Sequence, residues 1–127
     1  MNREILFRGK RTDNGQWAEG YLSSSKTIGA ISSVGNYDEY IIDPSTVCEY
    51  TGLTDKNGVK IFEGDIMRFN AYGLCRAGTV EYQDAAFCIL CQKPDAFPFL
   101  DDAIKRHEAE SIGNIFDNPE LLEEDNT

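Results

Sequence analysis

Short runs of strand-forming residues alternate with turn-forming residues along most of this chain, at intervals of about ten residues. The densest turn signal runs from Gly52 to Gly58, where glycine, aspartate and asparagine supply the backbone conformations that tight turns need. The runs of Val, Ile, Phe and Tyr on either side are too short to suggest helices. Such strands bury their apolar faces only within a larger sheet, so the pattern favours a small β-barrel or β-sandwich.

Residues 1–50 predict a β-hairpin followed by further strand. Residues 3–9 and 16–22 are rich in strand formers, and the turn between them contains Asn14-Gly15. Residues 23–36 are rich in serine and glycine and predict a loop or a weak strand. Further strands are expected at residues 37–43 and 45–51, interrupted by Pro44.

Residues 51–127 predict a barrel with helical C-terminal elements. Strands are expected at residues 59–62, 66–70, 78–82 and 86–92, with a loop at 71–77. Gly64 lies just before one short strand and Gly78 begins its partner, and small barrels turn corners at such glycines. We expect residues 1–50 to pack on this barrel as one compact unit.

The last third of the chain predicts two short helices around a final strand. Residues 101–107 place acids at the first turn of a helix and bases at its end, which matches the helix dipole. Residues 111–116 predict a strand. Asn118 and Pro119 then form a good helix start, with Asn118 as the cap.

The net charge is 12 − 22 = −10, and it is distributed unevenly. Residues 1–11 carry four bases and one acid, a local +3, whereas residues 95–127 carry ten acids and two bases, a local −8. The opposite ends are either separately solvated or paired electrostatically, within one subunit or between subunits. A chain of this charge repels polyanions unless one face is locally basic.

Targeting and membrane signals are not evident in the sequence. No apolar run approaches the ~20 residues of a membrane-spanning helix. The first residues lack the basic-then-apolar pattern of a signal peptide. We therefore expect a cytoplasmic protein without membrane partners.

Four cysteines are present, and without export we expect reduced thiols. Cys88 and Cys91 have the spacing of metal ligands, and Cys75 is a candidate third ligand. Residues three apart on a strand point to opposite faces, however, so the two thiols should diverge. We favour an apolar structural role over metal binding and expect no cofactor.

Catalytic chemistry has few candidate residues. His107 is the only histidine, and its position on a charged helix predicts an exposed side chain. Glu63 and Asp65 are two apart and could act as paired carboxylates. Gly64 lies between them, which favours instead a tight corner whose acids bond backbone N–H groups. We expect no catalytic site and no enzyme.

The N-terminal hairpin is the best candidate for a binding surface. Its basic residues and its tryptophan could form one face for a protein or nucleic-acid partner, and they are Arg3, Arg8, Lys10, Arg11 and Trp17. The net charge makes nucleic acid the less favoured partner. A third interpretation is mimicry, in which the acidic surface occupies the DNA site of a DNA-binding protein.

The chain resembles the YopX family of phage and prophage proteins. The resemblance lies in REILFRGKRTDNGQWAEGYL (residues 3–22), IIDPSTVCEYTGLTDKNGVKIFEGDIMRF (41–69) and SIGNIFDNPELL (111–122). It implies a mainly β protein with an SH3-like barrel in its C-terminal part, self-association, and a phage or prophage origin in a bacterial cytoplasm. It supplies no catalytic residues. The matching residues are mostly turn and core types, namely Gly15, Trp17, Gly52, Asp55, Gly58, Glu63, Gly64, Asp65, Gly113, Asn114 and Pro119.

These observations predict a non-enzymatic phage accessory protein that binds another protein or assembles with itself. A homo-oligomer is expected because a domain of many short strands has sheet edges to cover. The other partner is a phage or host protein that the sequence does not identify. The alternatives are a nucleic-acid-binding barrel that uses the basic hairpin and an acidic DNA mimic.

Overall fold

The computed structural model describes residues 6–24, 26–31, 37–71, 74–83, 85–91 and 98–124. Strands dominate these residues, and only two short α-helices accompany them, so the predicted mainly β class is confirmed. The chain divides into two compact units, residues 1–52 and residues 53–127. Within the described residues no helix combines the length and apolarity needed to cross a bilayer.

The first unit begins with the expected hairpin of β1 (Phe7–Lys10) and β2 (Trp17–Ser24). It continues through β3 (Thr27–Ile31), β4 (Tyr37–Ile41), the 3-10 turn η1 (Pro44–Thr46) and β5 (Cys48–Thr54). The antiparallel strand order is β4-β3-β2-β1-β5, and β5 continues into the second unit, where β6 (Lys60–Phe62) pairs with it.

Close backbone approach lets the sheet of the first unit curl tightly. A Cβ atom on Gly20 would lie 2.1 Å from the carbonyl oxygen of Gly29, so only glycine fits this position. At one end the sheet returns to its first strand, because Thr12 N donates to Ile41 O at 3.0 Å and Arg11 forms a β-bridge with Ile42. The inner face buries Ala18, Ile28 and Ile42, against which Phe7, Tyr40 and Val47 pack.

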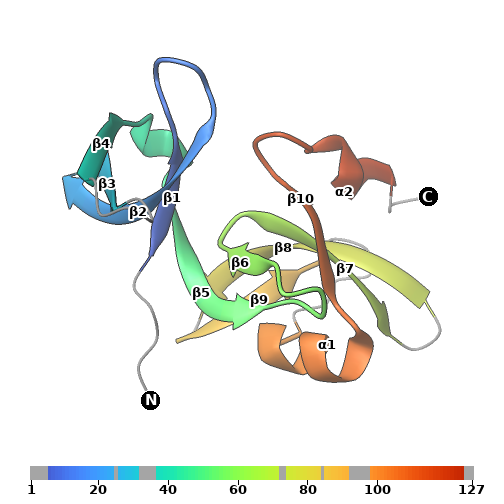
Figure 1. Ribbon diagram of the computed structural model, residues 1–127. Helices are drawn as coiled ribbons and strands as arrows, with labels where there is room; N and C mark the ends of the chain where they lie inside the picture. Colours follow the sequence, from blue (N-terminus) through green and yellow to red (C-terminus); the bar gives the residue numbers. More distant parts are fainter. Residues whose placement is uncertain are drawn as a thin grey trace. The chain divides into compact units, whose positions relative to one another are not determined.

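The second unit contains a four-stranded antiparallel sheet and both helices (Figure 1). Its elements are β6 (Lys60–Phe62), β7 (Asp65–Ala71), β8 (Leu74–Gln83), β9 (Ala86–Leu90), α1 (Leu100–His107), β10 (Glu110–Asn114) and α2 (Glu120–Glu124). The strand order of the sheet is β10-β7-β8-β9. The last strand therefore pairs with β7, the first strand of this sheet in chain order.

Helix α1 covers one face of this sheet and contacts β7 and β9. Its buried residues Leu100 and Ala103 complete a core that also contains Ile61, Met67, Phe69, Val80, Ile89, Cys91 and Ala109. As predicted, Asp101 and Asp102 lie in its first turn and Lys105, Arg106 and His107 in its last. Glu108 ends the helix in a left-handed conformation with φ 54°.

The closed SH3-like barrel expected at residues 51–127 is not confirmed, because the described ladder of this sheet does not close. At the β9 edge of the sheet, the residues just before α1 pair with β9, so no further strand lies there among the described residues. Ile89 N donates to Pro98 O at 2.9 Å, and Cys88 forms a β-bridge with Phe99. The chain then enters α1, so this edge is covered without closure.

Several predicted element boundaries are wrong for identifiable reasons. Residues 45–46 belong to the turn η1 instead of a strand, because Asp43 Oδ1 accepts the N–H of Ser45 at 3.0 Å. For residues 23–36 the strand alternative is confirmed, because Thr27–Ile31 form the regular strand β3. Residues 74–77, expected in a loop, belong to the long strand β8. Gly78 therefore lies in the interior of this strand, where a Cβ would approach Leu90 O to 2.5 Å, so the close pairing with β9 requires glycine.

Candidate functional site

The outer face of the first hairpin gathers charged and aromatic side chains from two strands. The register places Arg8 opposite Glu19 and Lys10 opposite Trp17. Directly opposed residues point to the same side of a sheet, and residues two apart on one strand do so as well. We call the resulting set, Arg8, Lys10, Trp17, Glu19 and Tyr21, the hairpin face.

Both cations of this face lie over the ring of Trp17. The Cζ atom of Arg8 lies 4.6 Å from the centroid of the Trp17 ring, and Nζ of Lys10 lies 5.4 Å from it. Both distances fall within the range of a cation–π interaction, which contributes about 0.5–1 kcal/mol at an exposed site. The ring thus fixes the two positive charges side by side at the outer surface of the hairpin.

Carboxylates interrupt the positive charge on the same side of the sheet. Glu19 is exposed and directly opposite Arg8. Tyr21 pairs with Gly29, which pairs in turn with Glu39, so the Glu39 carboxylate also lies on this side. Ser23 Oγ donates to Glu39 Oε1 at 3.2 Å. The Tyr21 ring is 58% exposed beside them, so the surface is mixed in charge and partly apolar.

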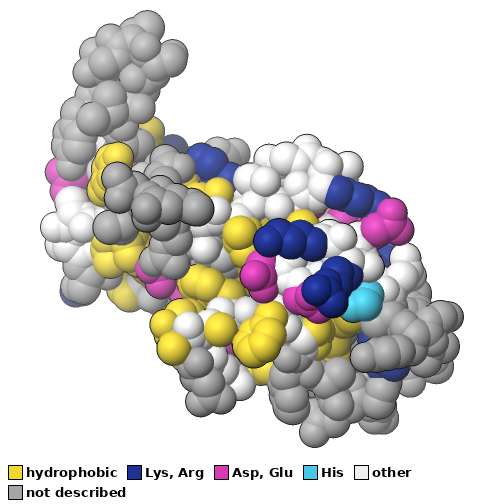
Figure 2. All heavy atoms as spheres, turned by 90° about the horizontal axis from the view of Figure 1, so that it is seen from below, with side chains coloured by type: hydrophobic (Ala, Val, Ile, Leu, Met, Phe, Trp, Pro, Cys, Tyr) yellow, Lys and Arg dark blue, Asp and Glu magenta, His cyan; other side chains and the backbone are white. Residues whose placement is uncertain are grey.

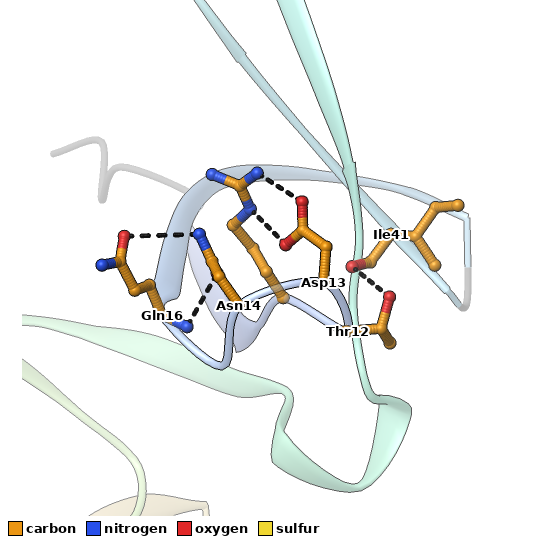
Figure 3. Close-up of polar contacts among 6 residues, drawn as sticks. Thr12, Asp13, Asn14, Gln16 and Ile41 are labelled. Atoms are coloured by element: carbon orange, nitrogen blue, oxygen red, sulfur yellow. Dashed lines mark hydrogen bonds and ion pairs between the residues drawn. The ribbon is translucent and has the colours of Figure 1, made fainter.

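Arg11 does not join the hairpin face, which corrects the prediction of a single basic surface. Its guanidinium lies on the opposite side of the sheet, 4.5 Å from the centroid of the Tyr40 ring. It also donates to both carboxylate oxygens of Asp13, at 3.0 and 2.6 Å (Figure 3). This hydrogen bonding raises the pKa of Arg11 and lowers the pKa of Asp13. Arg3 lies outside the described residues.

The hairpin loop that carries Arg11 is held by polar contacts within the loop and to the end of β4 (Figure 3). Asn14 Oδ1 accepts the N–H of Gln16 at 3.0 Å, and Thr12 Oγ1 donates to Ile41 O at 3.4 Å. Gly15 has a φ of 70°, as the Asn-Gly turn predicted. The loop is therefore folded back on the end of β4.

Of the two acids considered for catalysis, Asp65 holds a turn. Asp65 is buried, and its Oδ2 accepts the N–H of Phe62 at 2.8 Å. Gly64 between the two acids has a φ of 84° and donates to Val80 O at 2.9 Å. Glu63 is half-buried. A general base must present its carboxylate to a substrate, whereas that of Asp65 is buried and bonded to the backbone of its own turn.

His107 is half-buried, which corrects the expectation of an exposed side chain. Its ring lies 6.4 Å from the ring of Phe69, centroid to centroid, because the last turn of α1 packs against β7. Around this histidine, positive and negative side chains lie next to one another (Figure 2). The helix surface is thus mixed in charge, and Arg106 bonds Asp102 within it at 3.0 Å.

The cysteine side chains that the structure describes are buried thiols. Cys91 lies in the core of the second unit, and Cys88 lies on β9. Their sulfur atoms donate weakly to the carbonyl oxygens of Ile89 and Ala86, at 4.0 and 3.9 Å. Among the described residues no three metal-ligating side chains come together. The Cys75 side chain lies outside the described part.

Asp55 joins the central turn to the last strand. Its Oδ1 accepts the N–H groups of Asn57 at 2.9 Å and Val59 at 3.0 Å, while its Oδ2 accepts the N–H of Ser111 at 3.0 Å. The residue is only 5% exposed. Burial opposes its ionisation, but these three hydrogen bonds together with the charge of Lys56 lower the pKa of Asp55. The role of this residue is structural.

The remaining turn residues fix the end of β10 and the glycine-led corners. Asn114 Oδ1 accepts the N–H groups of Phe116 and Asp117 at 3.0 and 2.9 Å. A Cβ on Gly113 would lie 2.5 Å from Asn118 Oδ1, which accepts the N–H of Asn114. The Asn118 side chain therefore contacts the preceding strand, and Pro119 immediately precedes α2. Gly52 and Gly58 have φ values of 87° and 81°.

The sequence reasoning missed Glu19, Tyr21 and Glu39 as neighbours of the basic residues. A signal for two of them was present, since Trp17, Glu19 and Tyr21 alternate along one strand and must share a face. Glu39 could not be found this way, because its position depends on the pairing of β3 with β4.

One of three comparisons with known proteins identifies a family. The family model described as "YopX protein" matches residues 6–123. A solved structure, the crystal structure of protein EF1440 from Enterococcus faecalis, is similar with 27% identity and a TM-score of 0.58, over 95% of this chain and 99% of that chain. The search of curated proteins gave no match.

Proposed function

The chain belongs to the YopX protein family, and from this premise we propose that it is a non-enzymatic protein-binding module that docks through the hairpin face. We further propose that it is a phage or prophage accessory protein acting in the bacterial cytoplasm. The observation that carries the binding proposal is the pair of cations held on Trp17, with carboxylates beside them on one outer surface.

The chemistry of this surface favours a protein partner. A mixed pattern fits a protein surface that presents a carboxylate to Arg8 and Lys10 and a cation to Glu19 and Glu39. Tyr21, 58% exposed, adds an aromatic contact of the kind enriched at protein interfaces. Glu19 and Glu39 would instead repel the phosphates of a nucleic acid, as would the net charge of −10.

The test compares two variants that lose the same charge. Arg8→Gln/Lys10→Gln removes both cations of the hairpin face, while Lys26→Gln/Lys105→Gln removes two exposed cations elsewhere. Each is used for affinity capture from lysogenic host cells, with quantitative mass spectrometry. We expect a protein that the wild type and the control retain and the hairpin variant loses. Equal capture by all three would refute docking through this face.

Two measurements separate the competing functions. A mobility-shift assay at low salt that shows hairpin-dependent binding of nucleic acid would replace the protein-binding proposal with the nucleic-acid one. Salt-sensitive capture of a DNA-binding host factor that persists in the Arg8→Gln/Lys10→Gln variant would favour DNA mimicry through the acidic surface. Far-UV circular dichroism confirms first that each variant is folded.

We also propose that a second copy of the chain is among the partners. The support is the charge difference between the chain ends, +3 over residues 1–11 (four bases and one acid) and −8 over residues 95–127 (two bases and ten acids). Opposite charges of this kind orient two copies head to tail. Light scattering should show an oligomer that weakens with salt, and a strict monomer at micromolar concentration would refute self-association.

A further inference from the structure

Two Asn-Gly pairs occur in this chain, and both lie in turns between strands. They are Asn14-Gly15, between β1 and β2, and Asn57-Gly58, between β5 and β6. The glycines have similar backbone conformations, with φ values of 70° and 81°. Each glycine N–H donates to a main-chain carbonyl of its own turn, Gly15 to Arg11 O at 2.9 Å and Gly58 to Asp55 O at 3.0 Å. The two sites are therefore a matched pair.

An Asn-Gly pair can lose ammonia without an enzyme. The glycine nitrogen attacks the side-chain carbonyl carbon of asparagine, the new C–N bond closes a five-membered imide, and the bond to Nδ2 breaks. Ammonia leaves with the proton of the glycine nitrogen. Water then opens the imide at either carbonyl and gives aspartate or isoaspartate. Glycine favours this attack because it has no side chain to hinder the approach.

The reaction requires the turn to open, because the attacking nitrogen is held in a hydrogen bond. In the first turn the side-chain contacts are exposed (Figure 3). They are the ion pair of Arg11 with Asp13, the hydrogen bonds of Asn14 with Gln16, and that of Thr12 Oγ1 with Ile41 O. Two main-chain hydrogen bonds accompany them, Arg11 N to Gln16 O and Thr12 N to Ile41 O. Exposed side-chain contacts contribute little to stability, so the first turn opens readily.

The second turn is held from inside by a buried carboxylate. Asp55 is 5% exposed and binds the backbone N–H groups of Asn57 and Val59, on either side of Gly58. Hydrogen bonds to an ionised acceptor belong to the stronger class. The same carboxylate binds Ser111 of β10, so opening this turn also disturbs the sheet.

We propose that Asn14 is a site of spontaneous deamidation in the folded protein and that the Asp55 carboxylate protects Asn57 from the same reaction. The product adds one negative charge at the tip of the hairpin, next to Asp13. The inference rests on the geometry of the two turns and is independent of the proposed function.

The test incubates the folded protein in mildly alkaline buffer and follows both sites by peptide mapping with mass spectrometry. We expect Asn14 to convert at least ~tenfold faster than Asn57, which corresponds to about 1.4 kcal/mol more opening free energy at the second turn. In concentrated urea the two rates should become similar. Asn14→Gln should remove the hairpin product and leave Asn57 unchanged.

Loss of the Asp55 carboxylate supplies the second arm of the test. Asp55→Ala should accelerate conversion of Asn57 and leave the rate at Asn14 as it was. If that variant does not fold, the comparison of native with urea-treated wild type tests the same protection without a variant. Conversion of Asn57 in the native protein at or above the rate of Asn14 would overturn the proposal. A preference for Asn14 in urea as large as that in the native protein would overturn it too.

Discussion

Replacing Asp55 by alanine should destabilise the second unit by about 3 kcal/mol, because three backbone N–H groups lose a charged acceptor worth at least ~1 kcal/mol each. These groups belong to Asn57, Val59 and Ser111, at 2.9, 3.0 and 3.0 Å from the carboxylate. The first two are on exposed residues, where water replaces part of the loss, whereas the Ser111 group is half-buried. Because of this difference, we expect the loss of unfolding free energy to lie near the lower bound of about 3 kcal/mol.

Asp55→Asn distinguishes the contribution of Oδ1, which binds Asn57 and Val59, from that of Oδ2, which binds Ser111. An amide oxygen in the place of Oδ1 still accepts from Asn57 and Val59, but an NH₂ group then faces the N–H of Ser111. We expect an intermediate loss of about 1–2 kcal/mol, concentrated at β10. Urea unfolding followed by far-UV circular dichroism gives the free energies, and amide hydrogen exchange locates the loss. Trp17, the only tryptophan, reports separately on the first unit.

The pH dependence provides an independent check of the same carboxylate. The pKa of Asp55 is lower in the folded chain than its unfolded value of about 3.9. The stabilisation from its ionised form is therefore complete above the unfolded pKa and is lost as the pH falls through the folded pKa. The difference in stability between wild type and Asp55→Asn should thus be constant near neutrality and shrink in acid. A loss below about 0.5 kcal/mol for Asp55→Ala, the size of an ordinary surface substitution, would refute the reasoning.

Four further outcomes follow from other parts of the molecule. Gly20→Ala should prevent the first unit from folding, seen as loss of the Trp17 fluorescence transition, because its Cβ would lie 2.1 Å from a carbonyl oxygen of β3. Gly15→Ala should lower the unfolding free energy of the first unit by only about 1–2 kcal/mol, because Gly15 has a φ of 70° but an added Cβ there would meet no atom within 4 Å. Equal effects of the two substitutions would contradict the crowding argument. Leu100→Ala should lower the unfolding free energy of the second unit by about 2–5 kcal/mol in urea, because this fully buried side chain fixes α1 to the core, and a value under 1 kcal/mol would argue against that packing. The hydrogen bond from the Arg11 guanidinium lowers the pKa of Asp13. Carboxyl NMR should therefore show Asp13 titrating below the usual aspartate range, and its titration should return toward that range in Arg11→Gln. A titration that is the same in both proteins would show that the pair does not form in solution.

The positions of the turns could be predicted from the sequence because a turn depends on few residues. Gly15, Gly58 and Gly64 all have the positive φ that their turn motifs require. Helix α1 was predicted within one residue, since its acidic first turn and basic last turn match the helix dipole locally. The hairpin of β1 and β2 followed from the same short-range chemistry.

The faces of the hairpin could be predicted only in part. Alternation along β1 puts Arg8 and Lys10 on one side and Arg11 beyond it on the other, yet the sequence suggested one basic surface. The carboxylate of Glu39 reaches the hairpin side only because β4 pairs with β3. The charge character of the candidate site therefore depends on strand pairing and not on composition.

By itself, then, the sequence determined a mainly β chain, the places where it turns and the residues available for a charged surface. Only the tertiary structure decided which strands pair, that the first sheet curls where Gly20 meets Gly29, and that Asp55 binds Ser111 of the last strand. The physical reason is range. Turn and helix preferences arise between residues a few positions apart. Strand order and the partners of a buried carboxylate are set by contacts between residues distant in sequence. Forming such contacts costs loop-closure entropy, which cannot be read from a local sequence pattern.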